Sequence, residues 1–348
     1  MSRFLRSADL NRAFHDEVVR PLLGDTGYAA GLLGWGSDVL GYDTERSTDH
    51  GWGPRLSMFV DPADVVAVRE TMDAMLPGEF RGHPVRYGWD DEPLRHHVVV
   101  ETLPDWLTGQ LGLDASRPLS SIDWLLLPQQ QLLGVVGGQV YADDGRLAAV
   151  RAALAWYPDQ VWRWLLACQW RRIAQEEPFV QRTAEVGDEL GSAVVAARQV
   201  REVIRLALLL GRRFAPYGKW LGTAFAELDH GDGLDVTLRA AVDATDLGRR
   251  EEALGRAYET IARRHNATGL TAVVDPTLRT FHDRPARVLG ADRFVDACRA
   301  TVTDPSLRDL PLVGGVDQLA DSTDVLSDPG VYPRIAALFT PSARRATS

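Results

Sequence analysis

A Gly-Ser pair followed by an acidic residue and a strand-like run constrains the fold of this chain more than any other feature. The apolar stretch Tyr28–Leu33 breaks at Gly36-Ser37, eleven residues separate Ser37 from Asp49, and residues 56–60 have the pattern of a strand. Backbone N–H groups of such a turn can hold a phosphate. A carboxylate at the start of the next strand can hold the Mg²⁺ that accompanies a phosphate.

Each half of this pattern also has a purely structural interpretation. Ser37 is a favoured residue for capping the start of a helix, and an Asp such as Asp49 commonly closes a turn before a strand. The spacing of the two residues and their strand context favour the phosphate-binding interpretation, and both alternatives stay open at this point.

The arrangement resembles the nucleotidyltransferase superfamily that includes DNA polymerase beta and the aminoglycoside nucleotidyltransferases. The superfamily pattern is Gly-Ser, a spacer, Asp-x-Asp or Asp-x-Glu on a strand, and a third acid on a later strand. The chain is also similar to a bacterial family of unknown function, DUF4037, through residues 156–179, 185–193 and 215–225. Together the two resemblances span residues 28–228.

The resemblance implies an α+β protein, with an N-terminal nucleotidyltransferase-type mixed β-sheet with helices followed by an all-α helical-bundle domain. It implies Mg²⁺ and an NTP, expected to be ATP, as cofactors. The nucleotide would lie on Gly36-Ser37 with Arg55 nearby, and Asp49 and Glu101 would hold the metal. A hydroxyl of an unknown acceptor would attack the α-phosphate and release pyrophosphate.

The sequence departs from the superfamily at the second carboxylate. Residues i and i+2 share a face of a strand, so the partner of Asp49 should stand at position 51, which is Gly51. His50 would point to the opposite face. Either a nearby acid completes the metal site (Asp38, Asp43 or Glu45), or the fold is a degenerate one that binds a ligand or partner without nucleotidyl transfer. A third option is unrelated chemistry in the same cleft.

Glu101 is the candidate third carboxylate, because it ends the run Val98–Val100 and a lone acid there is costly to bury. In superfamily terms it would take a proton from the acceptor hydroxyl; the alternative is a strand-end acid that faces solvent. The adjacent His96 and His97 point to opposite faces of the strand, so no shared metal ion is expected.

The helical half carries further candidates. Resemblance to antibiotic nucleotidyltransferases makes Glu185 or Asp188 a candidate catalytic base, and the alternative is an acidic first turn that matches a helix dipole. Lys219 lies in Ala215–Trp220, a turn rich in Pro, Gly and aromatic residues, and is a candidate nucleotide or substrate contact.

Charged and aromatic residues elsewhere have both kinds of interpretation. Arg172 and Glu176 are four residues apart and can pair along a helix. A stripe of arginines is expected to be an ion-pair network rather than a triphosphate clamp, and two tryptophans beside the motif could stack on a base. The arginines of the stripe are Arg198, Arg201 and Arg205, and the tryptophans that could stack on a base are Trp35 and Trp52.

Composition limits the classes of partner. The net charge of −10 argues against broad binding to nucleic acids or to anionic membranes, which needs a positive field, but allows a small basic pocket for a nucleotide. No apolar stretch is long enough to span a membrane. The two cysteines, Cys168 and Cys298, sit in apolar helix-like contexts and are expected to be buried free thiols. We therefore expect a cytoplasmic protein whose partners are a nucleotide and an acceptor; the oligomeric state stays open.

Hydrophobic periodicity predicts the elements, with mixed α/β structure up to about residue 152 and nearly all-helical structure after it. The expected domains are 1–152 and 153–340, followed by a flexible tail, 341–348. Helices are predicted over 8–22, 61–76, 104–111, 120–136, 181–213 (one helix, or two meeting near Gly187 or Gly191), 234–268 and 290–303. A buried strand is predicted over 97–103. Asp144-Gly145 predicts a turn within 140–150, for which a hairpin is one interpretation.

Overall fold

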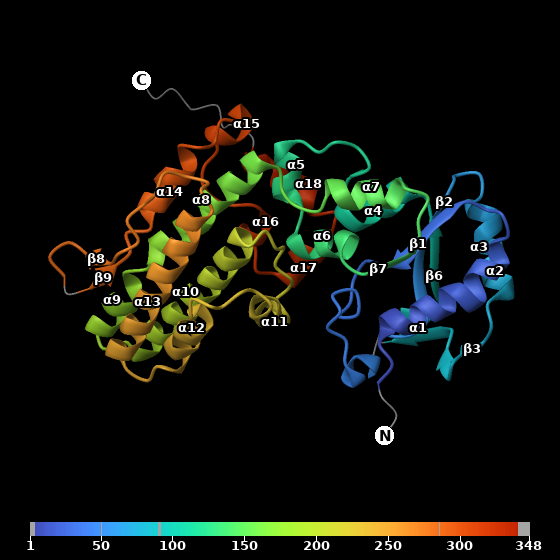
Figure 1. The fold of residues 1–348 in the computed structure, drawn as a ribbon, viewed down its shortest axis with the longest axis horizontal. Helices are drawn as coiled ribbons and strands as arrows, with labels where there is room; N and C mark the ends of the chain where they lie inside the picture. The colour runs from blue at the N-terminus through green and yellow to red at the C-terminus, as the bar shows by residue number, and fades with distance from the viewer. Residues whose placement is uncertain (1–3, 50, 90–91, 285, 340–348) are drawn as a thin grey trace. The chain divides into compact units, whose positions relative to one another are not determined.

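The structure is a computed structural model that describes residues 4–49, 51–89, 92–284 and 286–339. It divides into two compact units. Unit 1 comprises residues 1–119, 130–155 and 327–330, and unit 2 comprises residues 120–129, 156–326 and 331–348. Figure 1 shows a sheet with helices in unit 1 and a mainly helical unit 2. The expected mixed α/β N-terminal region and helical C-terminal region are therefore confirmed at this level.

A five-stranded mixed sheet organises unit 1, in the order β5-β6-β2-β1-β7. β1 is antiparallel to both β2 and β7, β2 is parallel to β6, and β5 forms an antiparallel hairpin with β6. The strands are β1 (Tyr28–Leu32), β2 (Arg55–Val60), β5 (Arg86–Trp89), β6 (Glu92–Glu101) and β7 (Gln139–Ala142), and β3 (Glu79–Phe80) pairs with β4 (His83–Pro84) outside the sheet.

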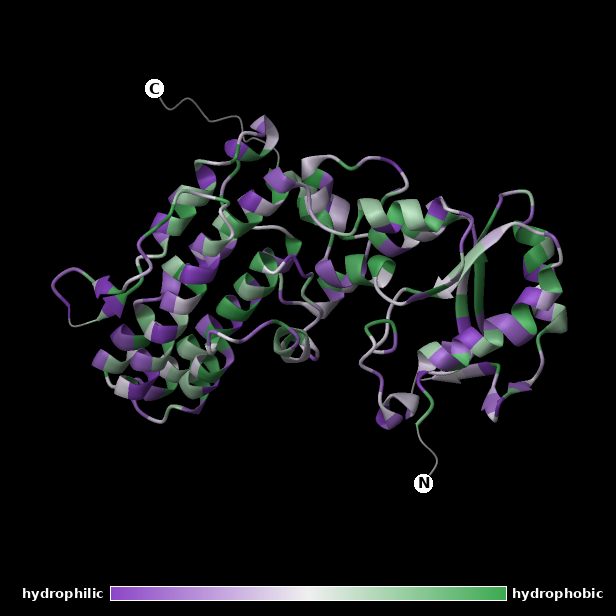
Figure 2. Cartoon of the chain, viewed as in Figure 1, coloured by the Kyte–Doolittle hydropathy of each residue, from purple (hydrophilic) through white to green (hydrophobic). Residues whose placement is uncertain are grey.

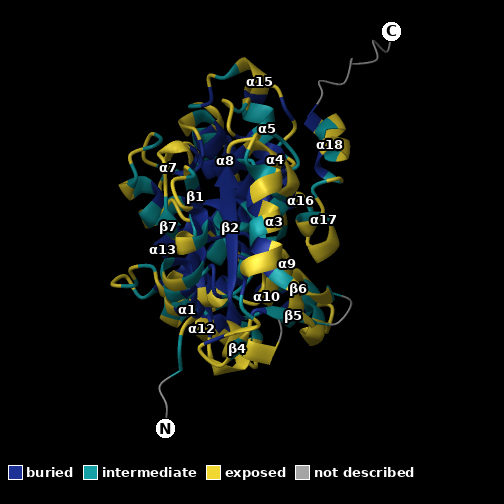
Figure 3. Cartoon of the chain, turned by 90° about the vertical axis from the view of Figure 1, so that its right-hand side faces the viewer, coloured by how far each residue is buried: buried dark blue, intermediate teal, exposed yellow. Residues whose placement is uncertain are grey.

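One face of this sheet carries the core of unit 1. Leu56, Met58 and Val60 of β2 share an apolar cluster with Val98 and Val100 of β6, as expected for alternate residues on neighbouring strands. Helical segments at the N-terminus and after β2 complete the cluster: α1 (Ser7–Phe14), η1 (His15–Val19), α2 (Arg20–Leu23) and α3 (Val65–Met75). Every residue of β2 is buried, which Figure 3 shows as a dark blue arrow.

The opposite face of the sheet is only partly covered. There α4 (Leu103–Leu111) brings the ring of Trp106 to 5.1 Å from the ring of Phe59 on β2. α6 (Gln129–Val136) precedes β7, and α7 (Arg146–Ala153) follows it. Asp143 and Asp144 accept hydrogen bonds from backbone N–H groups in the first turn of α7. The suggested hairpin within 140–150 is therefore wrong, because the Asp-Gly turn starts a helix and β7 pairs with β1 instead.

Unit 2 is built mainly from long helices that pack pairwise: α8 with α10 and α14, and α13 with α10 and α12. In Figure 2, hydrophilic and hydrophobic residues alternate along these helices, the pattern of amphipathic packing. The helices are α5 (Ser121–Leu126), α8 (Asp159–Glu176), α9 (Phe179–Glu185), α10 (Glu189–Leu210), α11 (Leu221–Ala226), α12 (Leu234–Asp243), α13 (Leu247–Ala267) and α14 (Asp292–Arg299), with a small hairpin of β8 (Arg279–Thr280) and β9 (Arg287–Val288).

Short helical turns make up the C-terminal part of the described chain: α15 (Pro305–Arg308), α16 (Val316–Leu319), α17 (Thr323–Ser327), α18 (Tyr332–Ile335) and η3 (Ala336–Phe339). The expected flexible tail, 341–348, lies outside the described residues. Both cysteines are buried free thiols, as predicted. Among the described residues, no helix is long and apolar enough to cross a lipid bilayer.

The predicted helical pattern over 181–213 forms two helices that meet near Gly187, rather than one continuous helix. Gly187 has a φ of 81° between α9 and α10, in a region that residues other than glycine rarely adopt. The strand predicted over 97–103 is longer at its start, since β6 begins at Glu92 and pairs with β5. The helix predicted over 61–76 starts late, at Val65, because residues 62–64 form a turn.

Candidate functional site

A buried network of hydrogen bonds connects the segment between β1 and β2 to α1. Asn11 of α1 accepts a hydrogen bond from the backbone N–H of Arg55 and donates to the carbonyl of Gly53. Asp43 accepts from the backbone N–H of Ser7 and from the indole N–H of Trp52. These contacts fix both ends of the segment, because buried polar groups need their partners.

Arg55 and Asp38 form the central ion pair of this network. The guanidinium of Arg55 binds both carboxylate oxygens of Asp38, at 3.1 Å through Nε and 2.7 Å through Nη2, and Nη2 also donates to the carbonyl of Trp35. Ser7 Oγ donates to the same carboxylate. Burial lowers the pKa of Arg55, but the contact with Asp38 outweighs it and the pKa is raised.

The Gly-Ser turn lies directly after β1, as the sequence predicts, and it packs against that ion pair. Gly36 has a φ of 118°, and a Cβ at this position would lie 2.3 Å from Oδ1 of Asp38 and 3.0 Å from Nη2 of Arg55. The glycine is therefore required by the close approach of the pair. Ser37 Oγ contacts Ser47 Oγ at 3.3 Å, which connects the turn to the following η2 (Glu45–Asp49).

A pocket of about 260 Å³ lies on the partly covered face of the sheet of unit 1. Its volume is near the lower end of the range for small-molecule sites. Three tryptophans contribute to its wall, and two arginines, a histidine and a glutamate supply charged or titratable groups. The lining residues are Leu32, Leu33, Gly34, Trp35, Arg55, Leu56, Ser57, Trp89, Glu92, Arg95, His97, Val99, Trp106 and Gln110.

Arg55 lines this pocket, and one nitrogen of its guanidinium has no hydrogen-bond partner among the described residues. Its Nε and Nη2 are committed to Asp38 and to the Trp35 carbonyl, and no hydrogen bond to Nη1 occurs among the residues that the structure describes. A bidentate carboxylate behind an arginine fixes the orientation of the guanidinium. The remaining N–H groups are thus positioned in advance for an anion in the pocket.

Aromatic rings form a continuous row beside Arg55. The ring of Trp35 lies 5.1 Å from the guanidinium carbon and 5.4 Å from the ring of Trp89. Trp89 in turn lies 5.0 Å from the ring of His97, and His97 lies 4.2 Å from Tyr87. Trp35 is half exposed. Such rings offer flat apolar surface on which a planar group can stack.

Asp49 does not lie on a strand, and this part of the prediction is wrong. It ends η2 and is exposed, and β2 begins only at Arg55. The chain between Asp49 and Arg55 is not a continuous strand, because it contains Gly51 and Gly53, with φ values of 65° and 153°, and Pro54. The argument that residues 49 and 51 share a strand face therefore does not hold, and His50 lies outside the described residues.

Gly51 has a packing reason of its own. A Cβ on Gly51 would lie 2.6 Å from the ring of Trp35, so an aspartate at this position would require the indole to move. The ring that lines the pocket thus occupies the space that the second carboxylate side chain of the superfamily pattern would need.

Glu101 ends β6, two residues after Val99, which lines the pocket. In the parallel pairing of β2 with β6, Arg55 is opposite His97 and Phe59 is opposite Glu101. Four residues along a strand span about 13 Å, and Glu101 does not line the pocket. It is half-buried, and burial raises the pKa of its carboxyl.

Glu92 is the acid of β6 that lines the pocket, and the sequence reasoning missed it. It lies at the start of β6 and binds the guanidinium of Arg95 at 2.8 Å through Nε. No local pattern pointed to it, because its place beside the pocket follows from the pairing of β6 with β2.

The acids considered for the predicted Mg²⁺ site do not form a cluster among the described residues. No group of three or more His, Cys, Asp or Glu among them could hold a metal ion. Of the substitute acids, Asp38 is bound to Arg55 and Asp43 to Ser7 and Trp52, while Glu45 is exposed in η2. The magnesium site of Asp49 and Glu101 stays a prediction.

The acidic candidates of unit 2 have structural partners. Asp188 accepts a hydrogen bond from the backbone N–H of Gly191 and caps α10. Glu185 pairs with Arg284 at 2.9 Å. Lys219 is exposed in the turn before α11, with its Nζ 4.9 Å from the ring of Trp220. A role in catalysis or binding stays a prediction for all three residues.

The arginine stripe of α10 is an ion-pair network, as predicted. Arg198 pairs with Glu176 at 3.0 Å, and Arg201 pairs with Asp321 at 2.8 Å. The pairing of Arg172 with Glu176 along α8 is wrong, because Arg172 binds the buried Glu202 of α10 instead.

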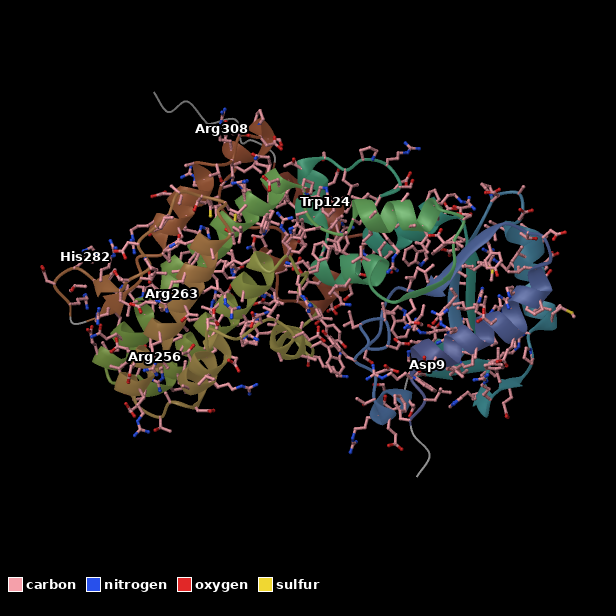
Figure 4. The ribbon with its side chains drawn as sticks, in the orientation of Figure 1. Asp9, Trp124, Arg256, Arg263, His282 and Arg308 are labelled. Carbon is pink, nitrogen blue, oxygen red and sulfur yellow. The ribbon has the colours of Figure 1, made fainter. Side chains whose placement is uncertain are left out.

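Comparison with known proteins finds a similarity in the middle of the chain. Residues 124–221 match the model of a family described as a domain of unknown function, DUF4037. The match begins at Trp124 of α5, labelled in Figure 4, and ends at the start of α11. No curated protein matches the chain. The pocket residues of unit 1 lie outside the matched segment.

Proposed function

We propose that unit 1 binds a nucleotide, in the pocket between the sheet and α4, without using it as the donor in nucleotidyl transfer. The observation that carries this proposal is the Arg55–Asp38 pair, which orients an arginine toward a pocket whose wall includes three tryptophans. A fixed guanidinium suits a phosphate, and indole rings suit a base.

Arg55 and Arg95 give the pocket two side chains that could contact an anionic ligand. Arg55 and Arg95 carry two positive charges, and Glu92 carries one negative charge among the lining residues. Arg95 is 57% exposed, so its side chain can turn from Glu92 toward a ligand at little cost. Asp38 behind Arg55 supplies a second negative charge, so an anionic ligand would gain a free positive charge when Arg95 leaves Glu92.

The test is calorimetric titration with AMP, ATP, GTP, CTP and UTP, each with and without Mg²⁺. We expect binding of at least one nucleotide that persists without Mg²⁺. Arg95→Gln should weaken it about three- to tenfold, the range of one exposed charge contact. The control is Arg20→Gln, which removes an exposed arginine of α2 that is paired with Asp16 and does not line the pocket. Equal affinities of the two variants would contradict the proposed site.

Nucleotidyl transfer from Mg-NTP to a hydroxyl of an unknown acceptor is the second candidate. The observation that favours it is the layout of unit 1, in which the Gly-Ser turn follows β1 and a parallel strand with an acid lies beside β2. Pyrophosphate release in the same samples separates the two candidates. Release that requires Mg²⁺ and is abolished by Asp49→Ala would support transfer, and binding without release would support the first proposal.

A further inference from the structure

His97 lies beside Arg55 with its ring orientation fixed. Its Nε2 lies 2.9 Å from the carbonyl oxygen of Tyr87. A carbonyl can only accept, so Nε2 carries the hydrogen and donates it. In the neutral ring the lone pair is therefore on Nδ1. No hydrogen bond to Nδ1 occurs among the described residues, and His97 lines the pocket.

The surroundings of His97 keep the ring neutral near pH 7. It is buried against the rings of Tyr87 and Trp89, and this burial lowers its pKa. The charged groups around it are Arg55 on β2 and Arg95 and Glu92 on β6. The two arginines lower the pKa further, and the Tyr87 carbonyl and Glu92 oppose the shift without reversing it. Nδ1 is thus an acceptor rather than a donor.

The acceptor Nδ1 of His97 and the donor guanidinium of Arg55 lie side by side, and together they limit which ligands can bind both. Arg55 and His97 are opposite each other in the parallel pairing of β2 and β6, and neighbouring strands are about 4.8 Å apart. A ligand that satisfies both needs an anionic group and a hydrogen-bond donor at a similar separation. In a nucleoside phosphate, the donors nearest the phosphate are the sugar hydroxyls.

We propose that His97 is a specificity-determining residue of this pocket, whose Nδ1 accepts a hydrogen bond from a sugar hydroxyl of a ribonucleotide held by Arg55. This inference rests on the proposed nucleotide binding. It predicts that the pocket distinguishes ribonucleotides from deoxyribonucleotides, because a deoxy ligand leaves the buried acceptor without a partner.

The test is calorimetric titration with AMP, 2′-deoxy-AMP and 3′-deoxy-AMP. We expect one of the deoxy ligands to bind about tenfold more weakly than AMP, the effect of one buried hydrogen bond. His97→Gln should remove this difference by weakening AMP and the deoxy ligand that keeps the contacted hydroxyl, because the glutamine amide can still donate to the Tyr87 carbonyl but offers no acceptor at the position of Nδ1.

Each outcome decides between the alternatives. Equal binding of all three ligands by the wild-type protein overturns the inference about His97 and leaves nucleotide binding intact. An equal loss for all three ligands in His97→Gln assigns the residue a structural role and also overturns it. Absence of binding by any nucleotide, including the NTPs, overturns both proposals. The comparison of ligands in the wild-type protein does not depend on the folding of a variant.

Discussion

At the scale of single residues, glycines decide how closely the Gly-Ser segment approaches its surroundings. Gly36 admits the Arg55–Asp38 pair, and Gly51 admits the ring of Trp35. Both positions have positive φ values, so a side chain there meets backbone strain as well as a steric clash. The glycine of the Gly-Ser motif is therefore explained by packing, whether or not a phosphate binds at the turn.

Gly36→Ala should destabilise unit 1. The new methyl group would meet the Asp38 carboxylate, and we expect a loss of about 1–3 kcal/mol in the free energy of unfolding. Urea denaturation followed by circular dichroism measures it. Gly27→Ala is the matched control, because Gly27 precedes the same strand, has no positive φ and has no atom within 4 Å of an added Cβ. Similar midpoints for the two variants would refute the packing role of Gly36.

At the scale of elements, a buried ion pair joins α8 to α10 in unit 2. Arg172 binds both carboxylate oxygens of Glu202, at 2.8 and 2.9 Å, and Glu202 is only 1% exposed. Gln169 donates to the same carboxylate and accepts from Gln318 of α16. Because every member has a partner, the network fixes the register of the two long helices and the position of α16.

Arg172→Met should cost about 3–5 kcal/mol of unfolding free energy, because it leaves the Glu202 carboxylate buried without a counter-charge. Its neighbour Arg171 pairs with Asp292 on the exposed side of α8, so Arg171→Met should cost about 1 kcal/mol or less. Denaturant melts of the two variants give the comparison. The double variant Arg172→Met/Glu202→Leu should recover much of the loss, and no recovery would show that packing rather than the unpaired charge causes it.

At the scale of the whole molecule, the pH dependence of stability has a source in buried carboxyl groups. Glu177, at the end of α8, accepts hydrogen bonds from the backbone N–H groups of Leu289, Gly290 and Ala291, before α14. Burial raises its pKa to about 7, although these bonds oppose the shift. Burial likewise raises the pKa of Asp317 to about 6.

A raised carboxyl pKa means that the folded chain binds more protons than the unfolded chain over the interval between the two pKa values. The stabilisation from Glu177 is therefore complete below its ordinary pKa of 4.5 and is lost as the pH rises to about 7. Glu177→Gln should flatten the decline of unfolding free energy over this interval. Glu252→Gln, which removes an exposed carboxylate of α13, is the control. An unchanged slope in Glu177→Gln would contradict the assignment.

Local patterns in the sequence determined much of the architecture. The apolar runs before Gly36 and after Arg55 are strands, the apolar periodicity after residue 158 is helical, and the turn after β1 lies where the Gly-Ser pair places it. These features depend on the spacing of apolar residues and on glycine, which act over a few residues. The chain's similarity to DUF4037 was also visible in its sequence, through segments 156–179 and 185–193, which fall within the matched residues 124–221, and 215–225, which overlaps their end.

Only the tertiary structure decided which side chains meet. The parallel pairing of β2 with β6 brings His97 beside Arg55 and carries Glu101 to the other end of the strand, and no local pattern specifies that register. Asp38 was considered as a metal ligand and is the partner of Arg55. Arg172 could reach Glu176 along its own helix and binds Glu202 on another. Such contacts join residues distant in the chain, so their geometry is set by packing of the elements rather than by spacing within them.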